Sequence, residues 1–147
     1  MVAGMSIDVI AEVHVRRPRD EVAAYMSDPA NDPEWIGGLR EARLLGDVPL
    51  GEGSRVARVA SFMGRKVEYV NEVTTLEPGR VLEMRSVKAP FPMHITYSFE
   101  DRDGRTLVRN HVRGGGGLFS LGSPLFAPMV RRSVRKDLER LRDVLER

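Results

Sequence analysis

The sequence predicts an α+β fold: a curved, seven-stranded antiparallel sheet around a long C-terminal helix, with two short helices after the first strand. Residues 39–112 show only strand patterns separated by short turns, and tight turns between successive strands are typical of antiparallel sheets. The end of the chain carries one long amphipathic helical pattern. At 147 residues the chain has the size of one domain, so we expect a single domain over residues 1–147.

The first strand and the two short helices occupy residues 7–36. Residues 7–15 alternate apolar and polar side chains, which indicates a strand. Pro18 fits the first turn of a helix that ends before residues 27–29. A second short helix is expected over residues 31–36, with Trp35 as a plug at the base of the sheet or as a ring that stacks on a ligand.

The remaining strands follow one another without an intervening helix. They are predicted at residues 39–45, 54–62, 66–76, 81–87, 92–100 and 105–112. A glycine run, Gly114–Gly117, then leads towards the last helix. Four glycines are costly to order, so this segment is interpreted either as a mobile gate beside a cavity or as a plain flexible connection.

The final helix is expected to begin after Ser123, a good N-cap, with Pro124 at its first position. Its apolar side chains recur every three or four residues and so share one face. They are Val130, Val134, Leu138, Leu141 and Leu145. The rest of the helix is rich in mixed charges, which we interpret as a solvated face with ion pairs rather than a surface for nucleic acid or membrane.

Composition and charge exclude several classes of protein. The chain has no cysteine, which rules out disulfides and thiolate metal sites and favours a cytoplasmic location. The N-terminus lacks the pattern of a signal peptide, and no apolar run approaches the roughly 18 residues of a membrane-spanning helix. A net charge of +2 is only weak evidence for nucleic-acid binding, because the charges are interspersed and not gathered in one block. We therefore expect no nucleic-acid partner and no stable membrane insertion, in a monomer or a homodimer.

Alternation assigns most side chains to a face of the sheet. In residues 66–76 the charges Lys66, Glu68 and Glu72 must face water, so the intervening side chains point inward. The inward set so predicted is Val67, Tyr69, Asn71, Val73, Leu82, Met84, Ser86, Met93, Ile95, Tyr97, Phe99, Val108, Asn110 and Val112. The strand at 54–62 is ambiguous, because one of its faces carries Arg55 and the other carries Arg58.

Two motifs after the first strand carry a resemblance to a known family. They are Arg17-Pro18-Arg19-Asp20-Glu21-Val22 and Asp28-Pro29-Ala30-Asn31-Asp32-Pro33-Glu34-Trp35. They resemble the opening of START-like (SRPBCC) domains of the polyketide cyclase/dehydrase group. The resemblance extends over essentially the whole chain. It implies the helix-grip fold, with a hydrophobic cavity between the sheet and the C-terminal helix.

The inward side chains and the resemblance together predict a function. We expect the chain to bind a hydrophobic or aromatic small molecule, lipid- or polyketide-like, in an apolar cavity with a few polar groups that orient the ligand. The predicted ligand-binding residues are Tyr69, Asn71, Met84, Ser86, Met93, Ile95, Tyr97, Val108, Asn110, Met129, Val130 and Val134. No cofactor is expected, because the dinucleotide fingerprint is missing, and no metal, because His14, His94 and His111 are scattered over three strands.

Two alternatives remain open at this point. The first is a cyclase, aromatase or dehydrase, in which Tyr69 or Tyr97 donates a proton to an enolate and Asn71 or Asn110 holds a carbonyl. No carboxylate, lysine or histidine has a clear inward parity to assist, and only Arg55 or Arg58 could supply a cation. The second is a ligand-free interaction module of the same superfamily, with a filled interior and an apolar patch. That patch would comprise Phe119, Leu121, Leu125 and Phe126.

Overall fold

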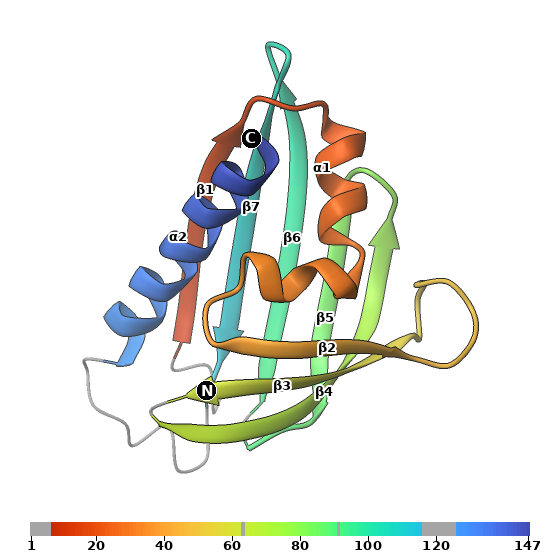
Figure 1. Cartoon of the computed structure of the whole chain (residues 1–147), viewed down its shortest axis with the longest axis vertical. Helices are drawn as coiled ribbons and strands as arrows, with labels where there is room; N and C mark the ends of the chain where they lie inside the picture. The colour runs from red at the N-terminus through yellow and green to blue at the C-terminus, as the bar shows by residue number, and fades with distance from the viewer. Residues whose placement is uncertain (1–6, 63, 91, 116–125) are drawn as a thin grey trace, which may run out of the picture.

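The computed structural model describes residues 7–62, 64–90, 92–115 and 126–147, and it confirms the predicted fold. All seven strands form one antiparallel sheet in the order β1-β7-β6-β5-β4-β3-β2 (Figure 1). The strands are β1 (Ile7–Val15), β2 (Leu39–Leu45), β3 (Arg55–Phe62), β4 (Arg65–Glu77), β5 (Val81–Lys88), β6 (Met93–Arg102) and β7 (Arg105–Gly114). The helices are α1 (Arg19–Met26), the 3-10 helix η1 (Pro29–Glu34) and α2 (Phe126–Leu145).

The sheet bends strongly along its length. In Figure 1, β2 and β3 run across the direction of β1, β7 and β6, and α2 lies alongside β1. The pairing register shifts once between β2 and β3 and twice between β4 and β5. Such bulges bend a strand and increase its twist, so they allow one continuous sheet to turn around α2.

The second short helix differs from its prediction in position and type. It is a 3-10 helix over Pro29–Glu34, two residues earlier than expected. The side chain of Asp28 caps it by accepting a hydrogen bond from the backbone N–H of Ala30 at 3.1 Å. Pro33 lies inside the helix and has no N–H to donate, which disfavours a longer α-helix here.

The core lies between the two α-helices and the concave face of the sheet. The predicted apolar face of α2 is correct, because Val134, Leu138 and Leu141 are buried. Met26 of α1 and Trp35 after η1 are also among the largest fully buried side chains. The predicted N-cap of α2, Ser123 with Pro124, lies outside the described residues.

Gly38, which leads into β2, offers a test of this architecture. Its φ is +79°, and a Cβ added there would lie 2.8 Å from the carbonyl oxygen of Ser61 on β3. We expect Gly38→Ala to lower the free energy of unfolding by roughly 2–3 kcal/mol, from backbone strain and the clash together. Urea denaturation measures this change.

Gly46→Ala is the matched control. Gly46 has a similar φ of +96°, but an added Cβ would meet nothing within 4 Å. It should therefore cost only the strain of the left-handed backbone, roughly 1 kcal/mol. Equal losses in the two variants would show that Gly38 and Ser61 are not in close contact.

Candidate ligand-binding site

A cavity of about 320 Å³ lies between the concave face of the sheet and α2. Its wall is formed by residues of all seven strands, of the links η1–β2 and β5–β6, and of α2, and most of it is apolar. Ten of the twelve predicted ligand-binding residues line it. These are Tyr69, Asn71, Met84, Met93, Ile95, Tyr97, Asn110, Met129, Val130 and Val134. Their contact with a ligand stays a prediction.

Ser86 and Val108 are not among the residues that line this cavity. The hydroxyl oxygen of Ser86 accepts a hydrogen bond from the backbone N–H of Met93 at 2.9 Å. Val108 is fully buried in the apolar core, opposite Val13 on β1 and Phe99 on β6. Alternation therefore predicts on which face of the sheet a side chain lies. It does not predict whether that side chain borders a cavity or is packed against other core side chains.

A buried ion pair joins η1 to β3 beside the cavity. Nη2 of Arg58 lies 2.8 Å from Oδ2 of Asp32, and the two side chains are only 4% and 2% exposed. Nη2 of Arg58 also lies 3.9 Å from the sulfur of Met84. This resolves the ambiguity of the β3 strand, because Val56, Arg58 and Ala60 share the inward face.

The ion pair adds a buried carboxylate, Asp32, that strand parity does not predict. Asp32 belongs to η1, where strand alternation does not apply, so its direction could not be predicted from parity. A signal was nevertheless present, since an arginine on the inner face of a strand needs a buried counter-charge. Arg58 lines the cavity, whereas Asp32 is not among its lining residues.

Burial and charge act against each other in this pair. Burial raises the pKa of the Asp32 carboxyl to about 6, although the positive charge of Arg58 opposes the rise. Burial acts to lower the pKa of Arg58. The negative charge of Asp32 is the largest of the effects that raise it, and together these effects outweigh burial. At neutral pH both groups are therefore charged, and the pair is ionic.

A second carboxylate, Asp137 of α2, lines the cavity directly. Its Oδ1 accepts hydrogen bonds from the backbone N–H of Gly37 at 2.9 Å and from Nη1 of Arg140 at 3.4 Å. The same Nη1 donates to the backbone oxygen of Trp35 at 2.8 Å. Asp137 and Arg140 thus fasten α2 to the link that follows η1. Asp137 is not among the predicted site residues, although it lies three residues after Val134 and borders the apolar face of the helix.

Two tyrosines supply hydroxyl groups to the cavity wall. Tyr97 is buried, and its ring meets that of Trp35 edge-on with centroids 5.7 Å apart. Burial raises the pKa of both Tyr97 and Tyr69, so both phenols stay protonated and can donate a hydrogen bond. Trp35 is at once a buried plug and part of the cavity wall.

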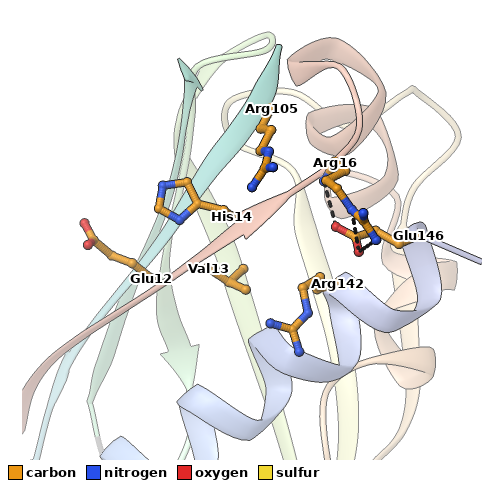
Figure 2. Close-up of a pocket in the computed structure, with 7 residues that line it drawn as sticks. All are labelled: Glu12, Val13, His14, Arg16, Arg105, Arg142 and Glu146. Atoms are coloured by element: carbon orange, nitrogen blue, oxygen red, sulfur yellow. Dashed lines mark hydrogen bonds and ion pairs between the residues drawn. The ribbon is translucent and has the colours of Figure 1, made fainter. Parts of the chain in front are cut away.

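A separate groove of about 540 Å³ lies at the outer edge of β1, near the end of α2 (Figure 2). Charged side chains dominate it. Arg16 and Glu146 form an ion pair at 3.3 Å, and the backbone N–H of Arg16 donates to the same carboxylate at 2.7 Å. Because it is open to water and charged, this groove is unsuited to an apolar molecule, and the cavity beneath α2 is the candidate site.

The glycine run, for which the sequence predicts either a gate or a plain flexible connection, lies only partly within the described residues. Gly114 ends β7, and Gly115 follows with a φ of +94°. The rest of the run lies outside the described residues, as do Phe119, Leu121 and Leu125 of the predicted interaction patch and the side chain of Phe126.

Comparison with known proteins identifies the family. A family model described as "polyketide cyclase / dehydrase and lipid transport" matches residues 6–146, so the chain belongs to this family. No curated protein matches the chain. None of the described helices is long and apolar enough to cross a bilayer.

Solved structures share the START-like fold over nearly the whole chain. The protein TTHA0849 from Thermus thermophilus is 19% identical to this chain, with a TM-score of 0.79. The match covers 92% of this chain and 94% of the chain of TTHA0849. The Zhui aromatase/cyclase from Streptomyces sp. R1128 is 21% identical with a TM-score of 0.77, covering 95% and 93%. A START superfamily protein from Mycobacterium smegmatis is 17% identical with a TM-score of 0.74, covering 95% and 97%.

The raised pKa of Asp137 makes stability depend on pH. Burial raises it from 3.8 to about 6, so the folded state binds this proton more tightly than the unfolded chain does. The carboxyl therefore stabilises the fold most below its ordinary pKa, and this contribution is lost as the pH rises through about 6. Asp137→Asn should reduce the loss of stability between about pH 4.5 and about pH 7 by about 2 kcal/mol.

Urea denaturation of both proteins across this pH range measures the difference. The other carboxylates, including Asp32, are present in both proteins and cancel in the comparison. Glu139→Gln, on the exposed face of α2, is the control and should leave the pH profile of the wild type unchanged. If the free energy of unfolding changes with pH in the same way in Asp137→Asn and in the wild type, the pH dependence does not come from Asp137.

Proposed function

We propose that the chain binds a hydrophobic or aromatic small molecule, lipid- or polyketide-like, in the cavity between the sheet and α2. The observation that carries this proposal is the mostly apolar wall of the 320 Å³ cavity, interrupted by a few polar side chains. Sites for small molecules commonly combine a large apolar surface with a small number of polar groups that fix orientation. The lipid-transport and cyclase descriptions of the family are consistent with such a ligand.

The volume of the cavity limits the size of the ligand. Small-molecule pockets usually measure roughly 300–1,000 Å³, and this cavity lies near the lower end of that range. It therefore suits a compact molecule, such as a fused-ring aromatic compound or a single short acyl chain. A phospholipid with two long chains would not be enclosed.

Native mass spectrometry, followed by a thermal-shift screen of aromatic compounds, short-chain lipids and sterols, tests the proposal. A ligand at about 100 times its dissociation constant should add about 2.7 kcal/mol to the free energy of unfolding. Ala60→Phe should abolish this gain, because Ala60 lines the cavity and a phenyl ring would fill it. Binding that survives in Ala60→Phe would place the ligand elsewhere.

Ala57→Phe is the matched control. Ala57 lies on the same strand, at a position of opposite parity to Arg58 and Ala60, and does not line the cavity. It adds the same side chain on the other face of the sheet, so binding should persist. A wild type that neither retains a small molecule nor gains stability from any compound would overturn the proposal.

A cyclase, aromatase or dehydrase activity is the second candidate function. It is supported by the two protonated phenols, Tyr69 and Tyr97, in one wall with the Arg58 guanidinium. Such groups could stabilise an enolate as a poly-ketone closes into a ring. The ligand-free interaction module receives less support, because it predicts a filled interior. A cytoplasmic location and a monomeric or homodimeric state stay predictions.

Replacing Tyr97 by Phe distinguishes catalysis from binding. If the tyrosine donates a proton, Tyr97→Phe should slow the cyclisation of a poly-ketone substrate by roughly 10²–10⁴-fold, since the phenol is lost while the ring is kept. Product formation followed by chromatography measures the rate. Tyr25→Phe is the control, because Tyr25 lies on α1 and bonds Glu34 away from the cavity. An unchanged rate in Tyr97→Phe would exclude this role for the phenol.

A further inference from the structure

We propose that the cavity selects uncharged ligands that carry a hydroxyl group, and that it rejects carboxylates of the same shape. This inference rests on the proposed binding function and adds the chemical class of the ligand's polar end. It follows from three features of the wall: a cation that is already neutralised, a carboxylate that faces the cavity, and a buried amide oxygen that has no hydrogen-bond partner among the described residues.

The first feature is the state of Arg58. Among the described residues that line the cavity, Arg58 is the only cation, and Asp32 already binds it at 2.8 Å. A carboxylate ligand would have to displace Asp32 or share the single positive charge with it, and in either case two carboxylates would face one cation. Because both side chains are almost completely buried, displacing Asp32 would leave one negative charge without compensation.

The second feature is Asp137, which reaches the cavity from α2. Its oxygen already accepts hydrogen bonds from the backbone of Gly37 and the side chain of Arg140. At neutral pH this group is ionised, because its pKa of about 6 lies below 7. Arg140 balances this charge in an ion pair at 3.4 Å, but it does not line the cavity. An anionic ligand would therefore meet the Asp137 carboxylate directly and be repelled by it.

The third feature is Asn110 of β7, which lines the cavity opposite Tyr97 in the β6–β7 pairing. Asn110 is only 6% exposed, and its Oδ1 has no hydrogen-bond partner among the described residues. Buried polar atoms are normally paired, so a ligand that donates a hydrogen bond would satisfy this oxygen. A hydroxyl suits the site in either orientation of the amide, because it both donates and accepts.

Arg58 adds a matching donor. Its Nε is buried and has no partner in the described part of the chain. A carbonyl or ether oxygen on the ligand could accept from this N–H without disturbing the ion pair with Asp32. The polar end of the ligand is therefore neutral, with a hydroxyl for Asn110 and an oxygen acceptor for Arg58.

Three probes of similar shape test the selection in the wild type: β-naphthol, β-methylnaphthalene and β-naphthoate. Isothermal titration calorimetry at about pH 7.5 keeps naphthol neutral and naphthoate charged. We expect naphthol to bind about tenfold more tightly than methylnaphthalene, and naphthoate at least about tenfold more weakly than naphthol. Naphthoate that binds as tightly as naphthol would overturn the charge selection and leave the proposed function standing. Failure of all three probes to bind would overturn this selection, whereas the proposed function is overturned only if the wild type also retains no small molecule and gains no stability from any compound.

Variants locate the selection in the named residues. Asp32→Asn releases Arg58, so the ratio of naphthoate to naphthol affinity should rise about tenfold or more. Asp137→Asn should raise the same ratio several-fold, and it carries the test if Asp32→Asn does not fold by circular dichroism. Asn110→Leu should abolish the preference for naphthol over methylnaphthalene. Glu139→Gln, on the exposed face of α2, should change none of these ratios. If every folded variant of Asp32, Asp137 and Asn110 keeps the affinity ratios of the wild type, these residues do not determine the selection.

Discussion

The ion pair between Asp32 and Arg58 is the constraint on which the interior of this protein depends. It joins the 3-10 helix η1 to the inner face of β3, with both charges removed from water. Breaking such a pair by removing one partner typically costs about 3–5 kcal/mol, because an uncompensated charge remains buried. The position of η1 relative to the sheet therefore depends on a single arginine of β3.

The link after η1 is also held from the opposite side. Asp137 and Arg140 bind the backbone of Gly37 and Trp35, so α2 is fastened to the same short segment that Asp32 anchors to β3. Trp35 packs edge-on against Tyr97 between these two attachments. The part of the cavity wall formed by Trp35 and Gly37 is thus held by hydrogen bonds from α2 and by the packing of Trp35 on Tyr97.

The parts of the site that could be predicted from the sequence are those on regular strands. Alternation placed Tyr69, Asn71, Tyr97 and Asn110 on the inner face, because side chains in a strand repeat every two residues. It could not orient Asp32, which lies in a 3-10 helix, or distinguish the two faces of β3, where arginines occur on both. Alternation also predicted the face of Val108 correctly. It could not show that other side chains pack around Val108 and separate it from the cavity.

The polar groups of the cavity are better explained by a ligand than by the stability of the fold. Burial raises the pKa of both Asp32 and Asp137 to about 6, so each carboxylate stabilises the fold less when it is ionised at neutral pH than when it is protonated at low pH. Apolar side chains of similar volume often replace a buried ion pair with no loss, or with a gain, in stability. Titratable groups perturbed in this way, gathered around a cavity, are characteristic of functional sites. In the selection that we propose, these same charges allow the cavity to distinguish neutral from anionic molecules.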